Sequence, residues 1–276
     1  GVTPAQPFWQ QKALIALERM VGRITTHWVA VSQADRRQGI EWGLFTASKV
    51  SVVRPGIDPT AFAARIESPE RDRLRAMLGV APDQLLVGTV SCLKPQKSPE
   101  DFVRVAALVC QRVPAARCVL VGDGALRPKV EALLLEQGLQ DRVTLLGWRR
   151  DVAALLKAFD VFVLTSQWEG LPCAILEARA SRIPIVATRV GGAAEAIVEG
   201  IQGTLCPAGD VRAMAERVCQ ILEDERFRVD LRTGTQELPE EFTIQETLKQ
   251  YQSLYAYLLH ATRPSEDVMK LQPNRL

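Results

Sequence analysis

Residues 161–190 read VFVLTSQWEGLPCAILEARASRIPIVATRV, and this stretch decides the fold class. Both of its ends are short apolar runs, which are typical of strands buried on both faces of a parallel sheet. The segment PCAILEARAS between them indicates a helix, because Pro172 suits the first helical position and Gly170 allows a turn before it. A strand–helix–strand unit with a right-handed crossover is the building block of a Rossmann-like fold.

The same alternation continues on both sides of this unit. Upstream, from about residue 83, the apolar runs LLVGTVSCL, RCVLVGDG and VTLLGW alternate with the helical segments PEDFVRVAALVCQRV, LRPKVEALLLEQGL and DVAALLKAF. Downstream, the segment AAEAIVE, the run GTLCP and a long helical region from Val211 follow. We therefore predict an α/β protein with a Rossmann-like, doubly wound parallel sheet covered by helices on both faces.

Shorter patterns flank this regular region. Ahead of it, ALIALERM reads as a helix, HWVAVS and KVSVV read as strands, and Ser32 can cap a short helix between them. The segment RPGIDP then suggests a linker, since Pro55 and its glycine neighbour interrupt regular structure. After it, IQETLKQYQSLYAYLLHA reads as a helix and the residues from 262 as a polar, frayed tail. We predict three parts: residues 1–53, 54–235 and 236–276.

The overall composition excludes several classes of protein. The 276 residues include 34 basic and 32 acidic side chains, and a net charge of +2 argues against a dedicated nucleic-acid binder. No apolar run reaches the length of a transmembrane helix, and the first residues lack the pattern of a signal peptide. A cytoplasmic location is therefore expected, and peripheral membrane attachment stays open.

Metal-binding and disulfide patterns are not evident in the sequence. The six cysteines show no CxxC spacing and are expected to be free thiols, most of them buried. The two histidines, His27 and His260, are too far apart to suggest a zinc cluster, and no D-x-D motif signals a metal clamp on a diphosphate. We expect no metal and no cofactor.

Ligands of an open α/β sheet collect at the carboxyl ends of the strands, so the turns after the strands are candidate sites. After the first strand, SCLKPQKSPED holds Lys94 and Lys97 beside a helix N-terminus, where an anion is favoured; two solvated lysines are the alternative. Ser98 is expected to cap that helix, with Asp101 completing a capping box.

Two further turns lie on the same predicted edge. In VGDG, Gly122 either lets the backbone approach a ligand or makes a tight turn. In GWRRD, Trp148 and Arg149 either flank a planar base or cover the edge of the domain. Neither turn is specific by itself.

The fourth turn carries two glutamates separated by seven residues, Glu169 on the loop and Glu177 in the following helix. They could be an acid–base pair, two ends of one ligand grip, or solvated side chains, because spacing alone does not give the carboxyl separation. The backbone N–H groups from Leu171 through Cys173 to Ala174 are free to point at a phosphate or sugar. A nicotinamide cofactor fits worse, since the first turn lacks G-x-G-x-x-G.

These motifs together resemble the family 4 retaining glycosyltransferases, which have the two-domain GT-B fold. Glu169 and Glu177 match the E-x7-E pattern of that family, EGLPCAILEA resembles its donor loop, GGAAEAI resembles the glycine-rich stretch that follows, and VVRPGID resembles its interdomain linker. The resemblance runs from about Leu14 to Tyr257. It implies transfer of a sugar from a nucleotide-diphosphate sugar to an acceptor with retention of configuration.

The resemblance also assigns roles to individual residues. It implies that Glu177 holds the ribose hydroxyls, that Glu169 contacts the donor sugar as the candidate catalytic residue, and that the amides from Gly170 onward cradle sugar and phosphate. Lys97 matches the lysine that binds the pyrophosphate. Cys92 stands where the family usually has an arginine, and Lys94 is a candidate substitute.

Members of that family normally begin with a second Rossmann-like domain that binds the acceptor. In this chain only the last elements of such a domain are expected, within residues 1 to about 50, so the chain is expected to be the donor-binding half. The apolar face of the helix ALIALERM is then expected to be covered by a partner subunit, a second copy or a rearranged packing. The alternatives for the function are a non-catalytic module that binds a nucleotide sugar and another GT-B-like enzyme, such as a sugar epimerase or a phosphorylase. The nucleotide base, the donor sugar and the acceptor are not specified by the sequence.

Overall fold

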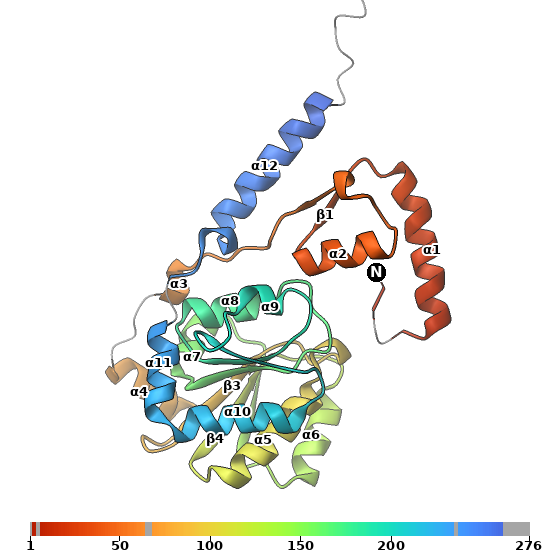
Figure 1. The fold of residues 1–276 in the computed structure, drawn as a ribbon. Helices are drawn as coiled ribbons and strands as arrows, with labels where there is room; N and C mark the ends of the chain where they lie inside the picture. Colours follow the sequence, from red (N-terminus) through yellow and green to blue (C-terminus); the bar gives the residue numbers. More distant parts are fainter. Residues whose placement is uncertain (1, 4–5, 64–67, 235–236, 262–276) are drawn as a thin grey trace, which may run out of the picture.

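The computed structural model describes residues 2–3, 6–63, 68–234 and 237–261. Its larger part is built on a six-stranded sheet in which every pair of neighbours is parallel (Figure 1). The strands, in spatial order, are β5 (Val143–Gly147), β4 (Ala116–Val121), β3 (Leu85–Val90), β6 (Val161–Leu164), β7 (Ile185–Thr188) and β8 (Gly203–Cys206). The predicted α/β fold with a parallel sheet is confirmed.

Helices cover both faces of this sheet, which explains why its strands are apolar throughout. Along β6, Val161 and Val163 belong to one buried cluster, whereas Phe162 and Leu164 belong to the other. The first cluster includes residues of α5 (Pro99–Arg112), α6 (Arg127–Glu136), α10 (Val211–Glu223) and α11 (Glu225–Gly234). The second includes residues of α4 (Ser68–Met77), α7 (Val152–Ala158), α8 (Cys173–Ala180) and α9 (Ala193–Ala196). Two cores therefore hold one sheet between them.

The strand order places a topological switch between β3 and β6. From β3 the chain moves to β4 on one side, and from β6 it moves to β7 on the other side. At such a point the loops that follow the two central strands diverge and leave a crevice at their carboxyl ends. Here those loops are residues 91–98 and 165–172. The topology thus brings together the two turns in which the sequence concentrates lysines and glutamates.

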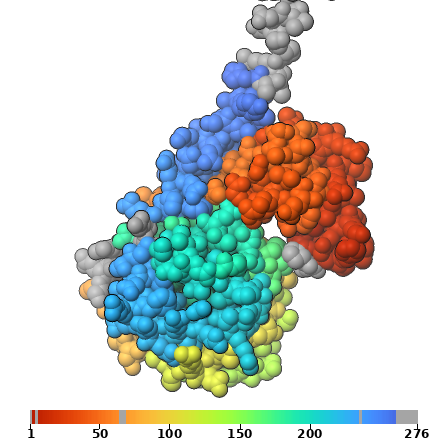
Figure 2. Space-filling view, viewed as in Figure 1, coloured from red at the N-terminus to blue at the C-terminus, as the bar shows by residue number. Residues whose placement is uncertain are grey.

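A smaller region precedes the large sheet. It contains α1 (Phe8–Ile24), α2 (Gln33–Glu41) and a parallel pair of strands, β1 (Trp28–Ala30) and β2 (Val50–Val52). The predicted cap of α2 is confirmed, because the hydroxyl of Ser32 accepts a hydrogen bond from the Asp35 amide at 3.0 Å. The space-filling view shows this region meeting the larger domain over a short contact, with a hollow beside it (Figure 2).

The last described helix is α12 (Ile244–Ala261), and contacts near its start connect it to the interdomain segment. Thr243 forms a bridge with Ile57, and the Thr247 hydroxyl donates to the carbonyl of Arg54 at 2.9 Å. Beyond this point the helix projects away from the large sheet (Figure 1). The polar tail expected from residue 262 lies outside the described residues.

Four short elements complete the described fold: α3 (Thr60–Ala63) and the 3-10 helices η1 (Ala47–Lys49), η2 (Pro95–Lys97) and η3 (Glu240–Phe242).

Large apolar side chains of α1 are exposed, as the sequence suggests. They include Leu17, Met20 and Ile24, with exposed fractions of 55%, 64% and 85%. Although α1 and α12 are long, no helix in the described ranges combines the length and the apolar character needed to cross a bilayer.

Candidate functional site

A buried carboxylate lies at the switch point, where the loop after β3 meets the loop after β6. Glu169 is 9% exposed, and one of its carboxylate oxygens accepts from the Lys97 ammonium and from the Ser166 hydroxyl, the latter at 2.6 Å. Its other oxygen accepts from the Gln96 side-chain amide at 3.3 Å. Burial of a carboxylate is costly unless it is paired and hydrogen-bonded, and Glu169 is both. The structure therefore brings two of the predicted residues, Lys97 and Glu169, into one ion pair.

The backbone of the loop after β3 is held by the loop after β6. The Thr165 hydroxyl lies 3.0 Å from the carbonyls of both Lys97 and Ser98, and the backbone amide of Gln167 donates to the Gln96 carbonyl at 2.8 Å. The backbone of Lys97 is thus held by the loop after β6 as well as by its own loop. Gln96 and Ser166 were not singled out by sequence, because neither is charged and neither lies in a recognisable motif.

The expected capping role of Ser98 is wrong. Ser98 adopts the left-handed region at φ 45° and its side chain accepts no bond from the amides of α5. Instead, its hydroxyl donates to the Asp101 carboxylate at 2.7 Å. The physical reason is the pinning of its backbone carbonyl, which turns the chain into a conformation from which the hydroxyl does not reach the helix amides.

Glu177 lies in α8 as a half-buried carboxylate, and within the described part of the chain no side chain or amide donates to it. Burial raises the pKa of Glu177, with no compensating hydrogen bond. The pKa of the Cys173 thiol is raised by burial and by Glu177 and Glu169, and is lowered by Lys97. Cys173, at the start of α8, therefore lies within electrostatic range of the two glutamates and the lysine. Cys173 and Ala174 begin α8, whose first amides have no partner within the helix.

Replacement of Glu177 by glutamine is expected to stabilise the folded chain at neutral pH. A carboxyl whose pKa is raised on folding favours the native state below its unfolded pKa, near 4.5, and loses this contribution as the pH rises through the folded pKa. Because glutamine does not ionise, Glu177→Gln removes this decrease in stability at neutral pH. We expect a gain of about 0.5–2 kcal/mol in the free energy of unfolding at pH 7.5.

Urea unfolding at pH 7.5 and at pH 4 measures this effect. The gain in the free energy of unfolding should vanish at pH 4, because the Glu177 carboxyl of the folded wild-type chain is then protonated and uncharged, like the glutamine. Glu216→Gln is the matched control, since Glu216 is exposed on α10. A loss of stability in Glu177→Gln at pH 7.5 would show that the Glu177 carboxylate has a favourable partner.

Two glycines hold the loop after β7 against the loop after β6. The Gly192 amide donates to the Gly170 carbonyl at 2.6 Å, and a Cβ at Gly191 would lie 1.7 Å from the Glu169 carbonyl oxygen. Gly191 also has φ 46°. The backbone of Glu169 and Gly170 therefore packs directly against the backbone of Gly191 and Gly192. Leu171 is buried in the core, so only its main chain is available to a ligand.

The other predicted residues lie along the same edge of the sheet, farther from Glu169. Gly122 follows β4 with φ 131°, and a Cβ there would lie 2.0 Å from the Ser91 carbonyl oxygen. Trp148 follows β5 and is 70% exposed, and the Arg149 guanidinium is paired with Asp151 at 2.6 Å. Lys94 is exposed in the turn after β3. Among the described residues, none of the four forms an ion pair with Lys97 or Glu169, and the strand order places them along the same edge.

A cavity of about 610 Å³ opens beside Glu169, between the large sheet and the N-terminal region. One wall is made by the loops after β6 and β7, including Trp168 and Glu169. The opposite wall includes Asp35 and Gln38, whose spacing places them on one face of α2, and Trp42, which directly follows this helix. No sequence pattern indicates this wall, because its position depends on how α2 packs. No group of three or more potential metal-ligating side chains comes together in the described ranges.

Glu195, in α9, connects the two regions. One carboxylate oxygen accepts from the Ala34 amide at 2.9 Å, and the other accepts from the Gln33 amide at 3.1 Å and pairs with Arg54 at 2.9 Å. An acidic side chain at a helix N-terminus satisfies free amides and interacts favourably with the helix dipole. Glu195 thus fixes the position of α2 and, with it, one wall of the cavity.

Glu195→Ala is expected to expose the first amides of α2 without unfolding the helix. Loss of hydrogen bonds to a charged group costs about 1.5–3 kcal/mol, so hydrogen exchange at Gln33 and Ala34 should accelerate about tenfold or more. The Asp35 amide provides an internal control, since its acceptor is Ser32. Exchange measured by NMR that accelerates equally at all three amides would instead indicate loss of α2 itself.

The strand order defines a doubly wound α/β domain, with the buried ion pair at its switch point. Ligands of such domains generally bind at the carboxyl ends of the strands. Residues 70–238 match the family model described as glycosyl transferases group 1. This match covers more than half of the chain, and the chain belongs to that family.

Curated relatives and solved structures agree with this assignment. The chain is 28% identical over 242 residues to the UDP-Gal:alpha-D-GlcNAc-diphosphoundecaprenol alpha-1,3-galactosyltransferase of Escherichia coli, covering 87% of this chain and 62% of that protein. It is 31% identical over 184 residues to the N-acetyl-alpha-D-glucosaminyl L-malate synthase of Bacillus anthracis, covering 66% of this chain and 48% of that protein. The chain thus spans about half to three fifths of the length of these relatives.

Among solved structures, Anabaena HepE in complex with UDP superposes with a TM-score of 0.79 at 25% identity, covering 92% of this chain and 70% of that one. The sucrose-phosphate synthase of Thermosynechococcus elongatus gives 0.79 at 25% identity, covering 94% of this chain and 65% of that one. The neighbours are GT-B glycosyltransferases, and this chain shares their fold.

Proposed function

We propose that the chain is the donor-binding half of a family 4 retaining glycosyltransferase and binds a nucleotide-diphosphate sugar along the carboxyl edge of the large sheet. The observation that carries this proposal is the ion pair of Lys97 with the buried Glu169, beside Glu177, a carboxylate without a polar donor in the described residues. The Glu169 carboxylate is oriented by its hydrogen bonds, whereas the Glu177 carboxylate has no donor in the described residues. This asymmetry favours a ligand grip over an acid–base pair.

In the proposed complex each part of the donor has a counterpart on the edge. The Glu177 carboxylate accepts from the two ribose hydroxyls, and Glu169 orients a hydroxyl of the donor sugar. Lys97, with Lys94 beside it, binds the diphosphate. The sugar and the phosphate also accept hydrogen bonds from the backbone amides of Gly170, Leu171, Cys173 and Ala174. The base lies near Gly122, Trp148 and Arg149.

The chemistry that follows is transfer of the sugar from diphosphate to an acceptor hydroxyl. The bond between the anomeric carbon and the diphosphate oxygen breaks, the acceptor oxygen bonds to that carbon, and the acceptor proton passes to the departing diphosphate. Lys97 and the first amides of α8 stabilise the negative charge that develops on the diphosphate, which is the largest contribution that such a site makes. Glu169 need not accept a proton for this reaction.

The cavity beside Glu169 is the proposed acceptor side. Its α2 wall offers a carboxylate, an amide and an indole, from Asp35, Gln38 and Trp42. Such side chains suit a polyhydroxylated ring, because hydroxyls need acceptors and the faces of sugar rings pack on aromatics. Burial raises the pKa of Asp35, as does Glu195 to a smaller extent, while the Ser32 hydroxyl lowers it.

The proposal retains the domain division expected from sequence: an acceptor-side remnant at residues 1–53, the donor domain at 54–235, and a crossing helix with its tail at 236–276. It also retains a partner subunit or second copy over the exposed face of α1. A cytoplasmic setting is supported by the cysteines, all six of which are free thiols. The second candidate function, a non-catalytic module that binds a nucleotide sugar, is favoured by Cys92 at the position where the family usually has an arginine.

Calorimetric titration with UDP, GDP and ADP and with their sugars tests the proposal. UDP is the first probe because a solved neighbour binds it. Saturable binding of one nucleotide supports the donor site, and turnover of its sugar rejects the non-catalytic alternative. Absence of binding by a chain that is folded by circular dichroism would overturn the proposal for this chain.

A further inference from the structure

A second cavity, of about 390 Å³, lies at the opposite edge of the large sheet. It is formed where α7 and α8 end, close to the residues that lead into β6 and β7. The lining includes Phe62 from α3, Ser181 at the end of α8, and Thr233 from α11. None of its lining residues belongs to the cavity beside Glu169, so the two are separate.

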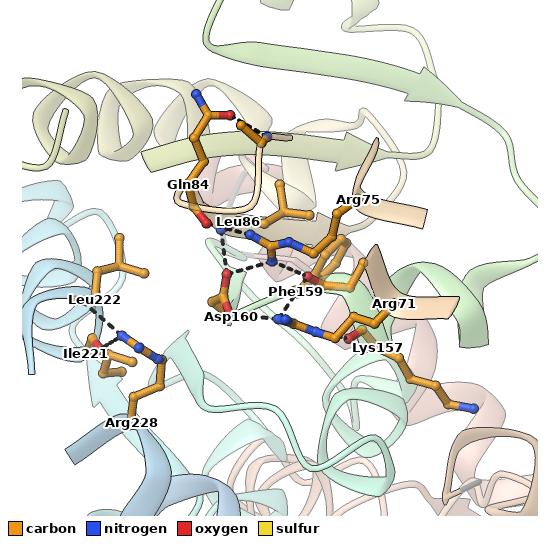
Figure 3. A network of polar contacts seen from close by, with 12 residues as sticks. Arg71, Arg75, Gln84, Leu86, Lys157, Phe159, Asp160, Ile221, Leu222 and Arg228 are labelled. Atoms are coloured by element: carbon orange, nitrogen blue, oxygen red, sulfur yellow. Dashed lines mark hydrogen bonds and ion pairs between the residues drawn. The ribbon is translucent and has the colours of Figure 1, made fainter. Parts of the chain in front are cut away.

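Four cationic side chains line this second cavity: Arg71, Lys157, Arg182 and Arg232. The only carboxylate that pairs with any of them in the described ranges is Asp160, which is shared between Arg71 at 2.8 Å and Arg75 at 2.9 Å (Figure 3). Within the same ranges Lys157, Arg182 and Arg232 have no ion-pair partner. The wall of the cavity therefore carries an excess of positive charge.

Backbone carbonyls explain the positions of some of these cations but do not neutralise them. The Arg71 guanidinium donates to the Lys157 carbonyl at 3.2 Å, and Arg232 donates to the Phe159 carbonyl at 3.0 Å. A carbonyl at a helix C-terminus carries only a partial charge. Burial lowers the pKa of Arg232, and Arg71, Arg228 and Arg75 lower it further, whereas Asp160 opposes them. Arg232 thus lies among several other cations, with Asp160 as the opposing charge.

A neutral donor accompanies the cations. Ser181 lines the cavity, and its hydroxyl oxygen is buried and has no hydrogen-bond partner among the described residues. A buried hydroxyl without a partner is costly, and such atoms point to a missing ligand or water. Several guanidinium and ammonium groups around one hydroxyl form the donor set that binds phosphate oxygens.

We propose that this cavity is a binding site for a small phosphate-bearing anion, distinct from the donor site at the switch point. Arg182 and Lys157 bind the phosphate from the open side, Arg232 and the Ser181 hydroxyl bind it from the buried side, and Arg71 is held in place by Asp160. The apolar wall near Phe62 leaves room for a non-phosphate part of the ligand.

Inorganic pyrophosphate is the probe, and the background is the combination of Lys94→Gln and Lys97→Gln, called the Lys97→Gln background below, which weakens binding at the proposed donor site. In this background we compare the further double replacement Lys157→Gln and Arg182→Gln with the single replacement Arg226→Gln. Arg226 is an exposed arginine on α11 that does not line the cavity. Calorimetry at constant ionic strength gives the dissociation constants, and thermal melts establish that each variant is folded.

The expected result is saturable binding that weakens about tenfold or more in the double replacement and stays unchanged in Arg226→Gln. Equal affinity in the double replacement and its background would overturn the proposal, and so would an absence of saturable binding in the Lys97→Gln background. Equal weakening in Arg226→Gln would overturn it as well, because it would mean a general effect of net charge. These outcomes do not depend on whether the chain binds a nucleotide sugar.

Discussion

Glu177→Ala is expected to lose most of the affinity for a nucleotide that we propose for the wild-type chain. The Glu177 carboxylate has no donor of its own in the described residues, so its hydrogen-bonding capacity is available to a ligand. If the two ribose hydroxyls donate to it, removal of these charge-assisted bonds costs about 1.5–3 kcal/mol, which corresponds to a dissociation constant about 10- to 150-fold larger. Calorimetric titration of both proteins with UDP measures the ratio.

The control for this experiment is a deoxyribose nucleotide. If Glu177 acts on the ribose, 2′-deoxy-UDP should bind the wild-type chain more weakly, and the Glu177→Ala variant should no longer distinguish the two nucleotides. Unchanged affinity for UDP in Glu177→Ala would show that Glu177 does not bind the ribose hydroxyls. Equal losses for both nucleotides would place Glu177 elsewhere in the binding site.

The largest loss of stability is expected from Asp160→Asn. The Asp160 side chain is 8% exposed, it pairs with Arg71 and Arg75, and it accepts from the Leu86 amide at 2.8 Å (Figure 3). Arg75 is itself only 6% exposed, so the neutral side chain leaves a buried guanidinium without its counter-ion. Loss of one partner of a buried pair costs about 3–5 kcal/mol. Urea unfolding at pH 7.5 should show this decrease.

The pH dependence gives this prediction a second, independent test. Burial raises the pKa of Asp160, but the Leu86 amide, Arg75 and Arg71 outweigh burial, and the pKa falls below its ordinary value of 3.8. A lowered carboxyl pKa contributes stability above the unfolded pKa, and this contribution is lost as the pH falls through the folded pKa. The difference between wild type and Asp160→Asn should therefore narrow below about pH 4.

Asp151→Asn serves as the control for the Asp160 experiment. Asp151 also pairs with an arginine, but its side chain is 44% exposed. An exposed pair contributes less than about 1 kcal/mol. Similar losses in the two variants would mean that burial of the Asp160 pair is not the cause.

The strands of the large sheet were predictable because burial on both faces demands continuous apolar runs, and β6 and β7 are buried at every position. Boundaries that depend on local backbone conformation were less accurate. The segment AAEAIVE was expected to be a helix, but α9 ends at Ala196 because Ile197 is extended, with φ −124° and ψ 126°. Pro172 precedes α8 and is not its first helical residue.

The candidate site was predictable where charge and topology coincide. Lys97 and Glu169 follow the two central strands, and the doubly wound order brings these turns together without further information. The supporting contacts were not predictable, because they need tertiary detail. Ser166 is an uncharged residue whose role depends on the direction of its hydroxyl, and Glu195 reaches the amide of Gln33, 162 positions earlier in the chain.

The contact between the loops after β6 and β7 affects how variation at Gly191 and Gly192 should be read in a saturation mutagenesis library. A Cβ at either position would meet the backbone carbonyl of Glu169 or Gly170, so alanine is excluded for the same reason as tryptophan. Both positions would then tolerate no substitution, whatever its polarity or size. Such uniform intolerance would follow from the close contact of two backbone segments. It would not indicate that either glycine contacts a substrate.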